Sequence, residues 1–175
     1  MRSKYVWFSI VLAIGLALDQ ATKSWARHVL RPLFPHARTI IPGYFDFRYA
    51  ENTGSAFSMF HNVPLAGYGL RIVGVFALFA IFLYLKRAAS DRLRFAAELG
   101  LLAGGALGNM FDRFAFGRVT DFIVWKVGVH EWPTFNVADA LLLVGVGLIL
   151  IDPPTLLQAT HAPTGKKPAP PSESA

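Results

Sequence analysis

The sequence predicts an all-α membrane protein in which four transmembrane helices carry a small extracytoplasmic β-subdomain, with the N- and C-termini in the cytoplasm. Of its 175 residues, 54% are hydrophobic and only 16% are charged, a composition typical of proteins that cross a membrane several times. Four apolar segments follow one another along the chain. Between the first and the second lies a stretch of β-forming and turn residues, which predicts the β-rich insert.

The first predicted transmembrane helix covers about residues 5–26 and follows Arg2 and Lys4. A cleaved signal peptide is the alternative for this segment, but the three further apolar segments favour a permanent helix. Asp19 and Lys23 stand four residues apart and therefore share one helical face. They either neutralise each other, which lowers the cost of insertion, or support a functional site, and the sequence leaves both possibilities open.

The β-rich insert is predicted at about residues 31–64. Two prolines near its start cannot continue the preceding helix, and two short strands are expected at residues 39–41 and 44–49. The run Asn-Thr-Gly-Ser that begins at Asn52 is typical of turns. It forms either a surface turn or a loop or edge strand that faces a substrate, with Asn52 as a hydrogen-bond donor.

The second and third helices are predicted at about residues 65–85 and 95–116. The short connection between them is basic, which places it in the cytoplasm; its basic residues are Lys86, Arg87, Arg92 and Arg94. The third helix is rich in glycine and alanine, so neighbouring helices can pack closely against it. At its outer end, Arg113 is expected either to pair with Asp112 or to orient a catalytic carboxylate, and Asn109 shares their face.

The fourth helix is predicted at about residues 136–151, and it completes a single domain over residues 1–152. A helix needs about 20 residues to cross a bilayer, so counting back from the inner end places Asp139 just inside the outer hydrocarbon edge. Alternatively, or in addition, Asn136 caps the helix and Asp139 complements its N-terminus. The remaining residues, 153–175, are polar and rich in proline and are predicted to form a disordered cytoplasmic tail.

Two carboxylates at the edges of apolar runs suggest the chemistry. Asp121 precedes the strand-like run Phe-Ile-Val-Trp, and Asp139 lies at the start of the fourth helix. An ionisable group in such a place is costly, which makes it a functional candidate. Two carboxylates that share one proton can activate a water and polarise a carbonyl, so the pair predicts an aspartic peptidase. The alternatives are a proton-coupled transporter with the pair as a relay, and a scaffold in which the carboxylates only cap and pair.

Other chemistries lack the residues that they need. The chain has no cysteine, which excludes thiolate nucleophiles and cysteine-ligated metals. His130 and Glu131 begin the metalloprotease motif H-E-x-x-H, but Thr134 replaces its second histidine, so we predict no metal and no other cofactor. Ser55 lacks the G-x-S-x-G surroundings of a serine nucleophile. The net charge is +6, and the basic residues flank the apolar segments. This placement is better explained by membrane topology and by binding to anionic lipid than by binding to nucleic acid.

The motifs resemble those of lipoprotein signal peptidase, the type II signal peptidase of bacteria. Five matching segments occur in the order found in that family: Asp19–Lys23, Glu51–Phe57, Gly104–Arg113, Val119–Ile123 and Phe135–Asp139. The resemblance implies that Asp121 and Asp139 are the catalytic pair. The residues implied to bind the substrate or to support the site are Asn52, Gly54, Asn109, Arg113, Asn136, Ala138, Asp112, Asp19 and Lys23. One departure is Thr120, where the family often has an apolar residue.

The resemblance also implies a substrate and a location. The substrate is a prolipoprotein that carries diacylglycerol on a cysteine, and the cut falls just before that cysteine. The enzyme is expected to be a monomer in the bacterial cytoplasmic (inner) membrane, in contact with membrane lipid, with its active site on the outer, periplasmic face. Trp125 and Trp132 suit the membrane interface. We expect the small-residue surface of the third helix to admit an acyl chain or the substrate's own helix.

Overall fold

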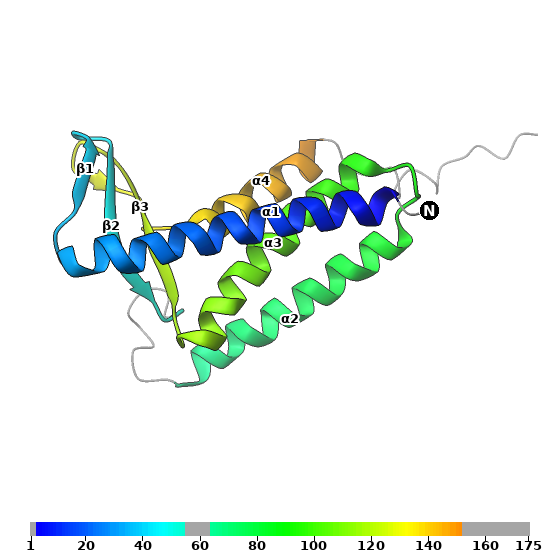
Figure 1. The fold of residues 1–175 in the computed structure, drawn as a ribbon, viewed down its shortest axis with the longest axis horizontal. Helices are drawn as coiled ribbons and strands as arrows, with labels where there is room; N and C mark the ends of the chain where they lie inside the picture. Colours follow the sequence, from blue (N-terminus) through cyan, green and yellow to red (C-terminus); the bar gives the residue numbers. More distant parts are fainter. Residues whose placement is uncertain (1–2, 55–63, 152–175) are drawn as a thin grey trace, which may run out of the picture.

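The computed structural model describes residues 3–54 and 64–151, which form a bundle of four long helices with a four-stranded sheet at one end (Figure 1). The helices are α1 (Ser3–Trp25), α2 (Pro64–Arg87), α3 (Leu93–Ala115) and α4 (Val137–Ile151). The strands are β1 (Arg38–Ile41), β2 (Phe45–Asn52), β3 (Val119–Val127) and β4 (His130–Glu131). The helices lie within a few residues of the predicted ranges, and the helical fold with a small antiparallel sheet is confirmed. The predicted tail at residues 153–175 lies outside the described residues.

The end of the bundle that carries the sheet is called the sheet end below, and α1 leads into it by an irregular path. After Trp25 the chain forms a π-helical turn at Ala26–Leu30 and a 3-10 turn at Arg31–Leu33. The prediction that the α-helix ends near residue 26 is correct, but the helical path runs on to Leu33. Pro32 is tolerated there because it occupies the start of the 3-10 turn, where its missing N–H would lack an intrahelical partner anyway.

The sheet has the order β1-β2-β3-β4, and every neighbouring pair is antiparallel. The strand β2 is longer than predicted and includes Asn52 as its last residue, opposite Val119. Asn52 therefore lies at a strand end beside β3, and whether its segment faces a substrate stays a prediction. Phe135 pairs with Ile123 of β3 in an isolated bridge, so the segment before α4 is held against the sheet close to Asp121.

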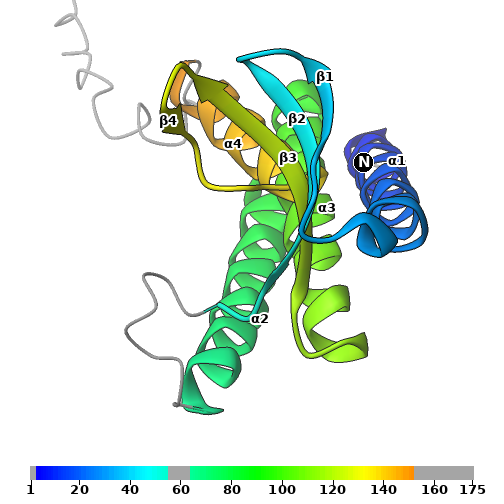
Figure 2. The ribbon, with the colours of Figure 1, turned by 90° about the vertical axis from the view of Figure 1, so that its left-hand side faces the viewer.

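The helix α3 lies at the centre of the bundle, between α1 and α2 (Figures 1 and 2). Its glycines permit close contact with α1 and α4. A Cβ atom on Gly100 would lie 2.8 Å from the carbonyl oxygen of Phe8, and one on Gly105 would lie 2.5 Å from that of Ala138. The expectation that this small-residue surface admits an acyl chain or a substrate helix is therefore wrong at these glycines, because α1 and α4 already occupy the space.

The helices are apolar outside and partly polar inside, the reverse of a water-soluble protein. Large apolar side chains such as Ile14, Phe76 and Leu143 are well exposed, whereas Asp19 and Lys23 are fully buried. Within the described ranges, two helical stretches are long and apolar enough to cross a membrane, Ser3–Leu33 and Gly69–Arg87, and α4 is a shorter apolar helix.

Candidate active site

The two candidate carboxylates meet at the sheet end through one asparagine. Asp121 is the third residue of β3 and Asp139 the third residue of α4. Asn136 donates from Nδ2 to Oδ1 of Asp121 over 2.6 Å. Its backbone N–H donates to Oδ2 of Asp139 over 3.2 Å, and its Oδ1 accepts the backbone N–H of Asp139 over 3.1 Å. This reciprocal pair of bonds is a capping box, so the predicted capping role of Asn136 is present beside its contact with Asp121.

Asn109 of α3 supplies the second contact to Asp139. Its Nδ2 donates to Oδ1 of Asp139 over 2.7 Å. Its Oδ1 accepts from Nζ of Lys23 over 2.9 Å and from Nδ2 of Asn136 over 3.2 Å. Since an ammonium group can only donate, Lys23 requires the oxygen of the amide on its side. The amide nitrogen must then face Asp139, and Lys23 thereby orients a group that touches a candidate catalytic carboxylate.

Asn52 contacts Asp121 from the end of β2. Its Nδ2 donates to Oδ2 of Asp121 over 3.0 Å, while its Oδ1 accepts the backbone N–H of Gly54 over 2.9 Å. Gly54 has φ +84°, and a Cβ atom there would lie 2.2 Å from Cδ1 of Leu70. Both the backbone conformation and the lack of space therefore favour glycine at this position. The turn after Asn52 fixes its amide so that the nitrogen faces the carboxylate.

Asp121 lies in surroundings that raise its pKa. The residue is only 2% exposed to solvent. Burial, reinforced by repulsion from Asp139, raises the pKa of Asp121 from 3.8 to about 6, although hydrogen bonds from Asn52 and Asn136 oppose this rise. A carboxyl group that holds its proton near pH 6 beside a second carboxyl group is what a shared-proton mechanism requires.

Asp19 and Lys23 form the intrahelical ion pair that their spacing suggested, and a role in supporting the site stays a prediction. Their side chains form an intrahelical ion pair of 3.0 Å and are fully buried. Asp19 also accepts the backbone N–H of Ala138 at its Oδ1 over 2.9 Å, which ties α1 to the start of α4. Gly108 makes room for this contact, since a Cβ atom there would lie 2.3 Å from Oδ2 of Asp19.

Asp112 lies in the same buried cluster and not against the candidate pair. It accepts the backbone N–H of Thr120 over 2.9 Å, and Nη1 of Arg27 lies 3.4 Å from its Oδ1. Arg27 and Thr120 were not among the predicted site residues, yet they complete this cluster: Arg27 also donates to Oγ1 of Thr120 over 3.1 Å. The spacing of four from Lys23 to Arg27 would have placed Arg27 on the same face of the helix.

Arg113 lies near both candidate carboxylates. Its Nη1 donates to the backbone carbonyl oxygen of Asn109 over 3.3 Å, and Asp139 and Asp121 both attract its guanidinium electrostatically. The alternative pairing with Asp112 is not what the structure shows, because Asp112 faces Arg27 and Thr120. A role in orienting a catalytic carboxylate remains a prediction. Among the described residues, no group of three His, Cys, Asp or Glu side chains is arranged to hold a metal ion.

The comparisons with known proteins agree on one family. The family model described as "Signal peptidase (SPase) II" matches residues 11–153. The chain is 37% identical over 154 residues to the lipoprotein signal peptidase of Geobacter metallireducens, covering 87% of this chain and 93% of that protein. It is 41% identical over 144 residues to the lipoprotein signal peptidase of Symbiobacterium thermophilum, covering 82% and 91%.

The fold agrees with a solved structure as well. A bacterial membrane enzyme determined by the in meso method at 2.3 Å resolution superposes with a TM-score of 0.73 and 27% sequence identity, over 93% of this chain and 94% of that one. These matches do not favour the transporter alternative. The chain belongs to the signal peptidase II family and is a membrane-bound aspartic peptidase.

Proposed function

We propose that Asp121 and Asp139 are the catalytic pair of this peptidase and that they activate one water molecule between them. The observation that carries this proposal is the bridge through Asn136, which hydrogen-bonds to both carboxyl groups. Their proximity also contributes to the raised pKa of Asp121. Neither a covalent intermediate nor a protein nucleophile is needed for such a reaction.

The surroundings of the two carboxyl groups suggest different roles. Asp121 has a pKa of about 6, and loss of the remaining water when a substrate binds raises the pKa of a buried carboxyl group further. Asp121 therefore holds the shared proton and donates it to the oxygen of the scissile carbonyl. Asp139, fixed by Asn109 and the backbone N–H of Asn136, takes a proton from the attacking water.

The remaining residues position the pair or the substrate. Asn52, Asn109 and Asn136 hold the carboxyl groups through their amide nitrogens. Gly54 and Ala138 shape the backbone next to these contacts, and Arg113 attracts both carboxylates. Asp19, Lys23 and Asp112 support the site from the buried cluster between α1, α3 and α4.

The protein cleaves signal peptides from lipoproteins, in keeping with its family. Its substrates are prolipoproteins whose cysteine already carries diacylglycerol, and the cut falls just before that cysteine. A diacylated cysteine is held at the membrane boundary, so the reacting groups must also lie there. The sheet end suits that boundary, because Trp125 and Trp132 are well exposed on it and tryptophan favours the interface.

The proposed topology has all four helices crossing the inner membrane, with both termini in the cytoplasm and the sheet end on the periplasmic face. The basic connection between α2 and α3 lies at the opposite end of the bundle and carries Lys86, Arg87, Arg92 and Arg94. Such clusters are retained on the cytoplasmic side. The enzyme acts as a monomer, and its exposed apolar helix faces contact lipid directly.

The test compares three aspartate variants in detergent with a diacylglyceryl lipobox peptide as substrate. Asp121→Asn and Asp139→Asn are each expected to abolish cleavage while circular dichroism shows intact folding. Asp46→Asn is the matched control, since Asp46 pairs with Lys126 in the sheet and contacts neither carboxyl group of the pair. Near-normal turnover by either of the first two variants would refute the two-carboxylate assignment.

A further inference from the structure

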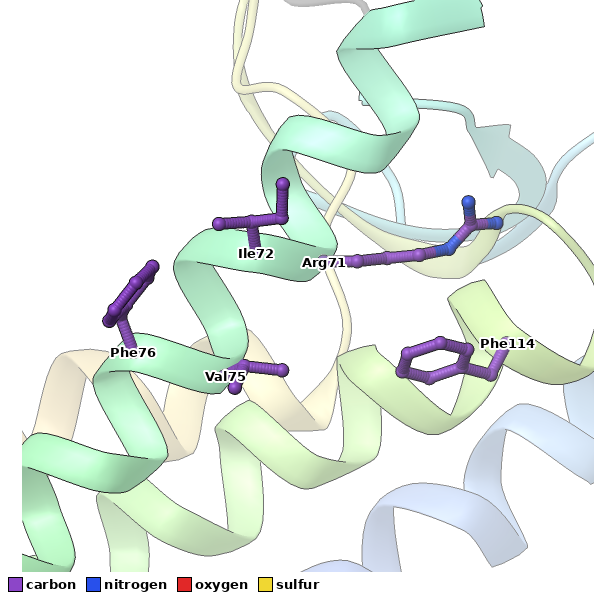
Figure 3. A pocket seen from close by; sticks show the side chains of 5 residues that line it. All are labelled: Arg71, Ile72, Val75, Phe76 and Phe114. Carbon is purple, nitrogen blue, oxygen red and sulfur yellow. The ribbon is translucent and has the colours of Figure 1, made fainter.

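The helix α3 packs closely against α1 and α4, whereas part of its boundary with α2 is open. Its glycines allow the close packing against α1 and α4. Toward the basic end, Ile81 and Leu85 of α2 pack into the core with Leu99 of α3. Toward the sheet end, α2 and α3 leave a cavity of about 410 Å³ between them. This α2–α3 groove is lined by Arg71, Ile72, Val75, Phe76 and Phe114 (Figure 3).

The lining of the α2–α3 groove is apolar except at one place. Arg71 extends from α2 toward α3, and Phe114 extends from α3 on the same side (Figure 3). The guanidinium of Arg71 lies 5.7 Å from the centre of the Phe114 ring, and its Nη2 donates to the backbone carbonyl oxygen of Arg113 over 2.7 Å. The groove thus combines an apolar wall with one cation at its sheet end, which suits an apolar chain that carries oxygen acceptors at one end.

A short series of contacts joins Arg71, at the sheet end of the groove, to the catalytic pair. Arg71 holds the carbonyl of Arg113, and Arg113 in turn donates to the carbonyl of Asn109 over 3.3 Å. The side chain of Asn109 donates to Asp139 over 2.7 Å. The sheet end of the groove therefore lies next to any substrate whose scissile bond is at Asp139, because α3 contacts both places.

The length of the exposed face of α2 matches one acyl chain in one leaflet. Below Phe76, the apolar side chains of Phe79 and Phe82 continue the face at helical spacing, and both are well exposed. Phe82 lies eleven positions after Arg71, which is about 16.5 Å along the helix at about 1.5 Å per residue. Half of a hydrocarbon core about 30 Å thick is about 15 Å.

We propose that the α2–α3 groove receives one acyl chain of the substrate's diacylglyceryl group, with Arg71 beside the ester oxygens. The inference rests on the proposed function, since it uses the lipidated cysteine as substrate and Asp139 as the reaction centre. Because a membrane is as apolar as the groove, the groove contributes little affinity. It orients the lipid, and with it the peptide bond next to the lipidated cysteine.

The first test locates the chain directly. A diacylglyceryl lipobox peptide with a photoreactive diazirine on one acyl chain is bound to the Asp139→Asn enzyme, and the adducts are mapped by mass spectrometry. We expect adducts at Val75, Phe76 or Phe114 in clear excess over Ile14 of α1 and Leu143 of α4, which are also exposed. Phosphatidylglycerol with the same photoreactive chain measures labelling by bulk lipid and should show no such excess. Equal labelling of all faces by the peptide, or a preference for α1 or α4, would overturn the proposal.

The second test fills the groove. Val75→Trp should lower kcat/KM by about 10- to 100-fold, because a displacement of about 1 Å at the reacting bond has an effect of this size. Val73→Trp is the matched control: Val73 is exposed on another face of α2 and should leave kcat/KM within about twofold. Equal effects of the two variants, with equal melting temperatures, would also overturn the proposal. Failure of the catalytic assignment is separate, since it appears as turnover by Asp139→Asn and leaves the labelling pattern readable.

Discussion

The raised pKa of Asp121 predicts how both activity and stability depend on pH. Folding raises this pKa from 3.8 to about 6, a difference of about 2 units or about 3 kcal/mol. A carboxyl group whose pKa rises on folding stabilises the protein below its unfolded pKa, and this contribution is lost as the pH rises through the folded pKa. The free energy of unfolding should therefore fall by about 3 kcal/mol as the pH rises from about 4 to above 6. Asp121→Asn should remove most of this pH dependence.

The same titration sets the alkaline limb of activity. If the pair must hold one proton, kcat/KM should fall with a midpoint near pH 6 in the wild-type enzyme. The hydrogen bond from Asn52 to Asp121 favours the ionised form. A hydrogen bond to a charged group is worth about 1.5–3 kcal/mol, or about 1–2 pH units. Because Asn52 is exposed and water can replace its amide, we expect Asn52→Ala to move the alkaline limb upward by about 1 pH unit.

The assay is cleavage of a fluorogenic diacylglyceryl peptide in detergent between about pH 5 and pH 8.5, with kcat/KM measured at each pH. Arg48→Ala is the control, because Arg48 lies on the same strand but bonds to Glu131 and Thr134, away from the pair. An alkaline limb that stays in place in Asn52→Ala, or that moves to lower pH, would refute the reasoning even if the variant were slow.

Three further predictions concern the buried contacts and the reaction type. Lys23→Met should lower kcat and shift the pH profile, because the amide of Asn109 is then free to turn, and Lys23→Arg should restore part of the profile; an unchanged profile in Lys23→Met would argue against this orienting role. Gly105→Ala should destabilise the protein by about 1–3 kcal/mol in thermal unfolding, since the new Cβ meets the carbonyl of Ala138 at 2.5 Å, while Gly147→Ala, which meets nothing within 4 Å, should not. Activity should survive EDTA, and a loss restored by zinc would indicate a metallopeptidase.

Much of the helical frame was predictable because apolar runs and their flanking charges act locally along the chain. The strands around Ile40 and Tyr49 and the cap at Asn136 were predictable for the same reason, through strand, turn and capping preferences. The contacts of Asp112 were not. Its partners, Arg27 and Thr120, come from two other segments, and only the packing of α1 against α3 brings them to the same place.

The small residues on α3 show the same difference between what local sequence predicts and what only the packing determines. Their number indicated a surface suited to close approach, but not which neighbour would use it. In the structure α1 and α4 take the surface around Gly100 and Gly105, and the open space lies on the side of α2. Composition alone therefore predicted that helices would pack closely, whereas the location of the remaining groove depends on the order of the helices around α3.

The capping box at the start of α4 has a consequence for how this enzyme can be inhibited or inactivated. Asp139 lies in the first turn of α4 and is the proposed catalytic partner of Asp121, so on this proposal its carboxyl group is already oriented before any peptide arrives. The cost of arranging it falls on folding rather than on catalysis. A ligand that pulls this side chain aside must also loosen the first turn of α4, so rigid compounds that accept the existing geometry should bind better than flexible ones that need it to adapt.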